Sequence, residues 1–307
     1  MKPLISITIP AFKAAFLKAA IESVTNQTYD KWELIILDDA SPEDIKTIFN
    51  GFTDNRIRYY RNEKNYGAVN VVDNWNKCLS LCRGEYVICM GDDDMLPSCS
   101  LTEYVKLMEE IPGLNVYHAL TEVVNERGEI TGRQRLRPKY QTVEELILHR
   151  WNGDIQFIGD FCYRVSYLKE HGGYYKLPLA WASDDLTAVR AAEEGGIANT
   201  QIPCFMYREN SMSISSSSNN GLKLDAKAEE RRWYMEFFKR HPNVREELYP
   251  IAFDNWFRSQ IEIHLLQYFE ESLLNLIPAL QKSKALGWKK SKILSRWWRV
   301  VKKKYKK

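Results

Sequence analysis

Apolar side chains in the first hundred residues follow two alternating spacings. Short runs rich in β-branched residues predict strands, and segments with apolar side chains at helical spacing predict helices. The predicted strands are Ile5–Ile9, Trp32–Leu37, Ile57–Tyr60 and Tyr86–Met90, and the predicted helices are 14–25, 42–50 and 68–82, with Ser41 as the N-cap of the second helix. This alternation is typical of βαβ units, so we expect an α/β fold with a mostly parallel sheet.

The alternation ends after residue 110. Residues 116–132 predict two strands joined by a turn at 125–128, and residues 183–194 predict a further helix. The polar segment 211–220 predicts a loop, and the pattern after it is helical throughout.

These patterns divide the chain into an α/β domain, residues 1–215, and a helical extension, residues 216–307. With 307 residues, of which 45% are hydrophobic, the chain is long enough for a large core. No apolar run reaches the roughly 20 residues that span a bilayer, and the first residues lack the cleavage site of an export signal. We therefore expect a cytoplasmic protein whose six cysteines, none in a Cys-x-x-Cys pair, are reduced.

Positive charge is concentrated at the end of the chain. Residues 286–307 contain ten of the 43 Lys and Arg residues and no acid, which leaves 33 basic and 40 acidic residues elsewhere. Apolar side chains recur there at helical spacing: Leu294, Trp297, Trp298, Val301 and Tyr305. Such a basic amphipathic helix is typical of a helix that lies on a membrane surface. The alternatives are packing of the tryptophans on the rest of the protein and stacking on nucleic acid; we favour the membrane and expect no nucleic-acid partner.

Two groups of aspartates follow predicted strands. Asp38 and Asp39 come after the second strand, and Asp92, Asp93 and Asp94 come after the fourth. Because ligands of open α/β sheets bind at the carboxyl ends of the strands, we expect both groups at one binding edge. Adjacent carboxylates repel one another, and a hard cation with phosphate ligands would offset the repulsion. A solvated turn or a helix N-terminus is the alternative.

Five segments in order resemble the landmarks of family 2 glycosyltransferases of the GT-A fold. They are ISITIPAFK, IESVTNQTYDKWELIILDDAS, NYGAVNVVDNWNKCLSLCRGEYVICMGDDDMLP, WASDDLTAVRAAEEGG and MYRENSMSIS. The resemblance covers about residues 3–215. It implies that residues 1–215 form a GT-A domain that binds a nucleotide-sugar and catalyses inverting, metal-dependent transfer of the sugar.

The resemblance implies a base pocket at the first strand. Pro10, Ala11 and Phe12 would line the pocket, and Asp39 would accept a hydrogen bond from the base. A carboxylate that accepts an imide N–H suits uracil or thymine. Asp38 is the weaker candidate for ligand contact and would cap the turn or touch the ribose.

The aspartate triplet resembles the Asp-x-Asp region of the family, which contacts the ribose and holds a metal on the diphosphate. Asp92 and Asp94 are the pair that we favour as ligands of Mn²⁺ or Mg²⁺. Asp93 is a nucleotide-binding candidate and the alternative metal ligand.

The last two segments resemble the block that supplies the catalytic base. Asp184, six residues before Arg190, is the predicted base, with Asp185 as the alternative and a helix N-cap as the structural interpretation of Asp184. Arg208 is the predicted contact to the diphosphate, with a surface ion pair as the alternative. Asn210 stands near the place where the family often has a histidine.

We therefore expect an inverting glycosyltransferase that moves a sugar from a UDP-sugar, or in second place a dTDP-sugar, to a hydroxyl of a saccharide or lipid-linked acceptor. We expect it to act in bacterial cell-surface polysaccharide synthesis, as a peripheral protein on the inner face of the cytoplasmic membrane. The rivals are a metal-dependent phosphohydrolase and a non-catalytic scaffold that binds nucleotide-sugar or membrane. No G-x-G-x-x-G or P-loop is present to support a dinucleotide oxidoreductase or an NTPase.

Overall fold

The computed structural model describes residues 2–210, 219–243, 246 and 251–305. It divides into two compact units. The α/β unit comprises residues 1–176 and 183–212, and the helical unit comprises residues 177–182 and 213–307. Most of the loop predicted at 211–220 lies outside the described residues.

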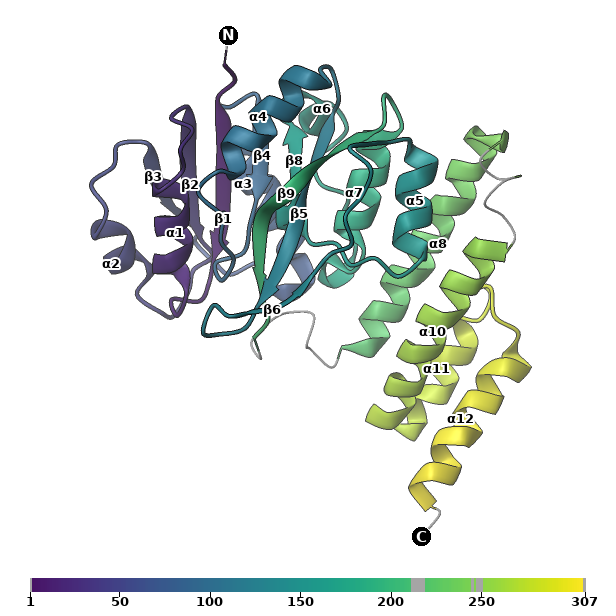
Figure 1. Cartoon of the computed structure of the whole chain (residues 1–307). Helices are drawn as coiled ribbons and strands as arrows, with labels where there is room; N and C mark the ends of the chain where they lie inside the picture. Colours follow the sequence, from purple (N-terminus) through teal and green to yellow (C-terminus); the bar gives the residue numbers. More distant parts are fainter. Residues whose placement is uncertain (1, 211–218, 244–245, 247–250, 306–307) are drawn as a thin grey trace. The chain divides into compact units, whose positions relative to one another are not determined.

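The α/β unit is built on a nine-stranded sheet with the order β3-β2-β1-β4-β8-β5-β9-β7, with β6 paired to β5 (Figure 1). The strands are β1 (Ile5–Ala11), β2 (Trp32–Asp38), β3 (Ile57–Arg61), β4 (Tyr86–Cys89), β5 (Val116–Val124), β6 (Ile130–Arg133), β7 (Tyr140–Gln141), β8 (Phe161–Arg164) and β9 (Ile197–Arg208). The first four strands are parallel, whereas β8 runs antiparallel between β4 and β5. The expected mostly parallel α/β sheet is confirmed.

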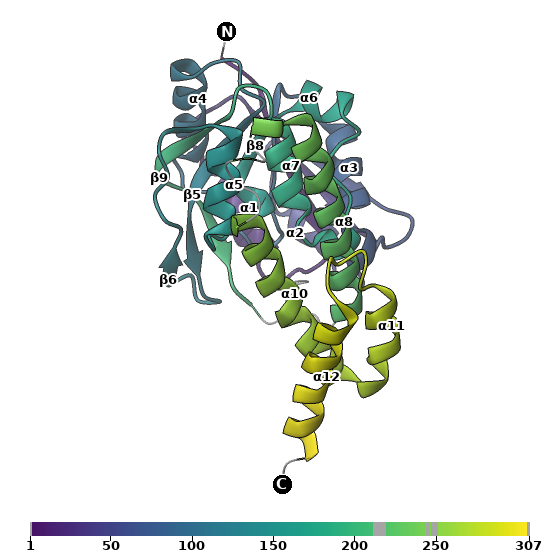
Figure 2. The same ribbon diagram turned by 90° about the vertical axis from the view of Figure 1, so that its right-hand side faces the viewer.

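Helices cover both faces of this sheet, with α4 on one side and α3, α6 and α7 on the other (Figure 2). The helices of this unit are α1 (Leu17–Thr25), α2 (Ile45–Asn50), α3 (Val71–Leu81), α4 (Ser100–Glu110), α5 (Val143–Trp151), α6 (Val165–Glu170) and α7 (Ser183–Ala192), with short 3-10 turns η1 (Ala68–Asn70) and η2 (Ile158–Asp160). Strands β1 and β2 are almost wholly buried, as expected for strands covered on both faces.

The structure corrects two details of the predicted elements. The second helix begins at Ile45 rather than at residue 42, because the carboxylate of Asp44 accepts the hydrogen bond of the Thr47 amide and so acts as the N-cap in place of Ser41. Strand β9 has no regular alternation of apolar and polar residues and was not predicted, since its burial depends on β5, its parallel neighbour.

The helical unit contains η3 (Pro178–Ala180), α8 (Asn220–Arg240), α10 (Ile251–Glu271), η5 (Leu273–Asn275), α11 (Leu276–Gln281) and α12 (Lys290–Tyr305). Its core is aromatic, with Tyr234, Phe237 and Phe253 fully buried between α8 and α10. Within the described residues, no helix is both long enough and apolar enough to cross a membrane.

Candidate active site

The loops that follow β1 and β2 are joined at one edge of the sheet. The Asp39 amide donates a 2.8 Å hydrogen bond to the carbonyl of Ala11. The buried Asp39 carboxylate accepts hydrogen bonds from Asn62 Nδ2 at 2.7 Å and from the Tyr66 amide at 3.0 Å. A carboxylate has about four acceptor positions, so these donors fix its orientation and leave capacity for a ligand N–H.

Asp38 has a structural role beside Asp39. Its fully buried carboxylate accepts hydrogen bonds from the Ser41 amide at 2.8 Å and the Tyr59 hydroxyl at 2.6 Å, and it pairs with Arg61. The predicted turn-capping role of Asp38 is therefore confirmed.

Asp92 fastens the loop after β4 to the loop after β1. Its Oδ2 atom accepts hydrogen bonds from the amides of Phe12 and Lys13, both at 2.7 Å. Its Oδ1 atom lies 3.4 Å from the Lys13 ammonium. Burial and the neighbouring Asp93 raise the pKa of the Asp92 carboxyl, although the charge of Lys13 opposes the shift. Asp92 therefore holds Phe12 at the edge where the base pocket was predicted.

Asp93 and Asp94 converge on Gly91. A Cβ atom at Gly91 would lie 2.6 Å from Asp93 Oδ1 and 2.8 Å from Asp94 Oδ2, so a larger residue here would force the two carboxylates to move. The other oxygen of Asp93 accepts hydrogen bonds from Lys13 Nζ at 2.5 Å and Asn210 Nδ2 at 2.8 Å. Asp94 accepts hydrogen bonds from the amides of Arg208 at 3.0 Å and Gly91 at 3.2 Å.

This pair of carboxylates suits a hard cation. Burial and the charge of Asp93 raise the pKa of Asp94 well above its ordinary value, so positive charge at this point would be stabilising. The described residues include no cluster of three or more His, Cys, Asp or Glu side chains that could hold a metal. Phosphate oxygens would have to complete the coordination, which is common for Mg²⁺ and Mn²⁺.

Arg208 is buried at the end of β9, and its guanidinium contacts three backbone carbonyls and the ring of Phe16. It donates to the carbonyls of Asp93 at 2.9 Å, Asn125 at 2.9 Å and Glu126 at 3.0 Å. Arg208 thus ties the aspartate loop to the turn between β5 and β6, and its contact with a diphosphate stays a prediction.

Lys13 is the cationic side chain that the sequence analysis missed at this edge. It is partly exposed, and its ammonium contacts both Asp92 and Asp93. Burial acts to lower the pKa of Lys13, but the charges of Asp92 and Asp93 outweigh it and raise the pKa. The sequence could have indicated Lys13, because it directly follows the segment predicted to line the base pocket.

Asp184 and Asp185 lie in the first turn of α7 and have different surroundings. The buried Asp185 carboxylate accepts hydrogen bonds from Arg150 Nε and Gln156 Nε2, both at 2.7 Å. Asp184 is half-buried, and burial together with the charge of Asp185 raises its pKa to about 8. No hydrogen bond or ion pair in the described part of the chain links Asp184 to the aspartate triplet.

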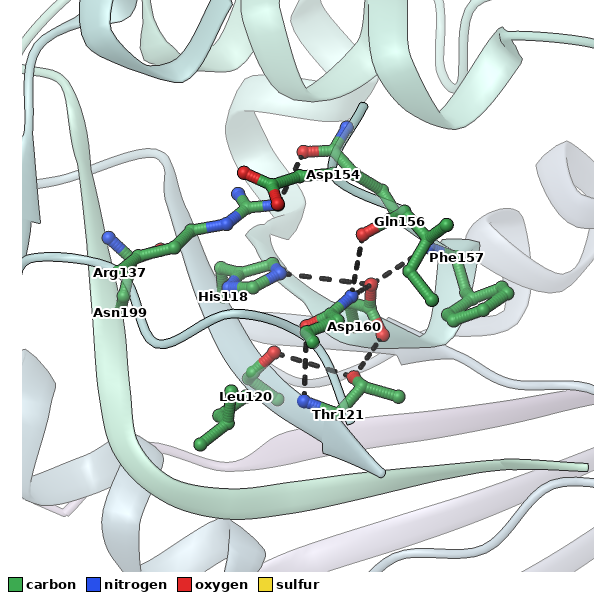
Figure 3. A network of polar contacts seen from close by, with 12 residues as sticks. His118, Leu120, Thr121, Arg137, Asp154, Gln156, Phe157, Asp160 and Asn199 are labelled. Atoms are coloured by element: carbon green, nitrogen blue, oxygen red, sulfur yellow. Dashed lines mark hydrogen bonds and ion pairs between the residues drawn. The ribbon is translucent and has the colours of Figure 1, made fainter. Parts of the chain in front are cut away.

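A buried polar network holds the segment that carries Gln156 (Figure 3). Gln156 Oε1 accepts a 3.0 Å hydrogen bond from Arg137 Nη2. Asp160, in η2, accepts hydrogen bonds from Gln134 Nε2 at 2.7 Å and from the Phe157 amide at 2.8 Å. These residues are scattered along the sequence, so no motif could have identified them.

The same segment reaches the neighbourhood of the aspartate triplet. The ring of Phe157 stacks on Tyr207 with centroids 3.7 Å apart, and Tyr207 precedes Arg208 in β9. This segment therefore contacts Asp185 through Gln156, and it contacts strand β9, which ends beside Asp94, through Phe157.

Comparisons with known proteins agree on a family. The model of Glycosyl transferase family 2 matches residues 6–172. The UDP-Glc:alpha-D-GlcNAc-diphosphoundecaprenol beta-1,3-glucosyltransferase WfgD of Escherichia coli is 25% identical over 223 residues, which cover 72% of this chain and 83% of that protein. The GalNAc(5)-diNAcBac-PP-undecaprenol beta-1,3-glucosyltransferase of Campylobacter jejuni is 32% identical over 111 residues, 35% of each protein.

The matches to several curated relatives, including the Campylobacter protein, span only about a third to a half of those proteins' lengths. Among solved structures, S. aureus TarS 1–349 in complex with UDP-GlcNAc has a TM-score of 0.63 at 15% identity, with 97% of this chain and 81% of that chain covered. This likeness concerns the fold, and it confirms the predicted GT-A architecture.

Proposed function

Because the chain belongs to glycosyl transferase family 2, we propose that it transfers a sugar from a UDP-sugar, or in second place a dTDP-sugar, to an acceptor hydroxyl with inversion. One observation carries the proposal. Asp39 and the aspartate triplet follow parallel strands β2 and β4, and contacts with Ala11, Phe12 and Lys13 join both groups to the end of β1. The names of WfgD, with its UDP-Glc donor, and of the TarS complex with UDP-GlcNAc support a uridine donor.

The donor base would lie against Pro10, Ala11 and the exposed ring of Phe12, with its imide N–H donated to Asp39. Asn62 and the Tyr66 amide fix the orientation of the Asp39 carboxylate. The carboxylate would therefore accept a hydrogen bond from one edge of the base. The Lys13 ammonium, 2.5 Å from Asp93 Oδ2, would attract the diphosphate.

Asp93 and Asp94 would hold Mn²⁺ or Mg²⁺ against the diphosphate. Asp92 was favoured over Asp93 from the sequence; its Oδ2 atom accepts hydrogen bonds from two backbone amides on a single oxygen, and its Oδ1 atom faces the Lys13 ammonium. The convergence of the Asp93 and Asp94 oxygens over Gly91 supports the other pair. When bound, the cation would neutralise charge on the leaving diphosphate.

Asp184 would act as the general base. The acceptor hydroxyl gives its proton to the Asp184 carboxylate, and its oxygen forms a bond to the anomeric carbon of the donor sugar. The bond from that carbon to the diphosphate oxygen breaks, and the electron pair leaves with the nucleoside diphosphate. A base with a pKa near the working pH is well matched to this transfer. Attack from the face opposite the diphosphate inverts the anomeric configuration once.

We further propose that the acceptor is a saccharide or lipid-linked sugar of a cell-surface polysaccharide, and that the protein works as a peripheral protein on the inner face of the cytoplasmic membrane. The undecaprenol-linked substrates in the names of two relatives support such an acceptor. The basic segment 286–307 supports contact with the membrane.

Isothermal titration of UDP into the whole chain, with Mn²⁺ and then with EDTA, tests the donor site. We expect Mn²⁺-dependent binding that Asp94→Ala abolishes and Asp93→Ala weakens, whereas Asp30→Ala, at an exposed position away from this edge, leaves it unchanged. Absence of UDP binding in folded protein would exclude the uridine donor and lead next to dTDP.

Turnover assays distinguish the rival functions. Release of phosphate from a nucleotide-sugar without any acceptor would favour the phosphohydrolase. Unimpaired function of Asp184→Asn in cells would favour the non-catalytic scaffold.

A further inference from the structure

Helix α12 carries three distinct stripes of side chains, two of them apolar. Ile293, Trp297 and Val300, spaced four and three residues apart, form a stripe that faces the helical unit: Ile293 and Val300 are buried, and Trp297 Nε1 donates a 2.9 Å hydrogen bond to the Leu273 carbonyl. This packed stripe accounts for one of the two tryptophans.

The second apolar stripe is exposed. Leu294, Trp298 and Tyr305 are separated by four and seven residues, so they lie along one narrow line of the helix. Their exposed fractions are 39%, 53% and 71%. The sequence had grouped Trp297 and Trp298 on one apolar face, but their environments differ.

Basic side chains form the third stripe. Lys292, Arg299 and Lys302 follow one another at separations of seven and three residues and are all exposed. In the part of the chain that the structure describes, neither Lys292 nor Lys302 has an acidic partner within ion-pair distance, and the nearest acid to Arg299 is Glu262, at 3.7 Å.

Two other basic residues have a different task. Arg296 forms a 2.8 Å ion pair with Glu262, and Lys303 forms a 2.8 Å ion pair with Glu270. Both glutamates belong to α10. Together with the packed stripe, these ion pairs fasten α12 to the helical unit. The exposed apolar and basic stripes are therefore presented by a helix that is already held in place.

Two further apolar side chains are exposed on the neighbouring segment. Helix α11 lies beside α12 in both views (Figures 1 and 2). Leu274 and Ile277 are strongly exposed, and Leu274 follows the residue whose carbonyl accepts the Trp297 hydrogen bond.

We propose that Leu294, Trp298 and Tyr305 insert into the headgroup region of an anionic lipid surface while Lys292, Arg299 and Lys302 contact its phosphates. A tryptophan and a tyrosine beside lysines and arginines are the side chains that an interfacial helix uses. This inference deepens the membrane part of the proposed function and depends on it, but it is independent of the donor and of catalysis.

Flotation of the whole chain with vesicles of phosphatidylglycerol and phosphatidylethanolamine, against vesicles of phosphatidylcholine, tests the proposal without donor or acceptor. We expect binding to the anionic vesicles only, weakened about tenfold by Trp298→Ser/Tyr305→Ser. The matched control Ile130→Ser/Leu136→Ser removes two side chains that are each 57% exposed on the α/β unit, and it should bind as the unaltered chain does.

Charge is tested separately. Lys292→Gln/Lys302→Gln should weaken binding to anionic vesicles, and added salt should weaken the unaltered chain further than this variant. Circular dichroism and UDP titration on each variant establish that folding and the donor site are intact.

Two results would overturn the proposal. Equal binding by Trp298→Ser/Tyr305→Ser and the unaltered chain would remove the exposed stripe from the contact. Binding to RNA with no binding to anionic vesicles would assign the basic stripe to nucleic acid. Loss of UDP binding with vesicle binding retained would instead reject the donor proposal and leave this one intact.

Discussion

Asp184 and Asp185 are neighbours in the first turn of α7, and the Asp185 carboxylate accepts hydrogen bonds from the side chains of Arg150 and Gln156. These donors stabilise the charged form of Asp185. That charge, added to burial, raises the pKa of Asp184 to about 8. Asp184 therefore has the pKa that the proposed general base requires.

We predict that Asp184→Asn lowers the turnover number by about 10²–10⁴-fold, because an amide cannot accept the proton of the acceptor hydroxyl. UDP affinity should stay unchanged, since Asp184 is outside the contacts of the aspartate triplet. Steady-state kinetics and UDP titration on the same preparation check both parts. Equal turnover by the variant would remove Asp184 from the mechanism.

The activity of the unaltered chain should rise with pH through about 8 and level off above it. The sign follows from the raised pKa of Asp184: below that pKa the carboxyl is protonated and cannot act as a base. Asp185→Asn removes a charge that contributes to the shift, so its rise should occur at lower pH. If the pH profiles of activity of Asp185→Asn and of the unaltered chain had the same midpoint, Asp185 would not set the pKa of Asp184.

Gly91→Ala should weaken Mn²⁺-dependent UDP binding by about tenfold or more, because the added methyl group would occupy the space of the Asp93 and Asp94 carboxylates. Gly132→Ala is the matched control, since its methyl group would meet Val123 at an ordinary 3.7 Å. Calorimetric titration measures the effect. Unchanged affinity in Gly91→Ala would contradict a metal site built from this pair.

Lys13→Met should weaken UDP binding by about tenfold while keeping most of the side-chain volume, because the ammonium is lost beside Asp93. The control is Lys18→Met, whose side chain is exposed and pairs with Glu22. A smaller effect at high salt would support attraction to the diphosphate. Equal affinities of the two variants would exclude Lys13 from the donor site.

Arg208→Lys should lower the free energy of unfolding by about 1–3 kcal/mol, because an ammonium cannot reproduce the forked contacts to the carbonyls of Asp93, Asn125 and Glu126. Denaturant unfolding measures this. A loss of UDP affinity without loss of stability would instead support the predicted diphosphate contact.

The sequence alone determined the strands that end at the candidate binding edge. Apolar runs of strand length, each followed by polar residues, located β1, β2 and β4. Because the carboxyl ends of parallel strands meet at one edge of the sheet, Asp39 and the aspartate triplet had to lie at the same edge. These features depend on local periodicity and on a general rule of α/β sheets. They could therefore be predicted without any knowledge of tertiary contacts.

Only the tertiary structure decided which residues share a contact. Gln156 reaches Asp185 across 29 positions of sequence, and Arg208 reaches Asp93 across 115. It also separated Trp297, hydrogen-bonded to Leu273, from the exposed Trp298, although both fit the same amphipathic pattern. Periodicity reports which side of an element is apolar, whereas burial and hydrogen bonding depend on the partner that packs against that side.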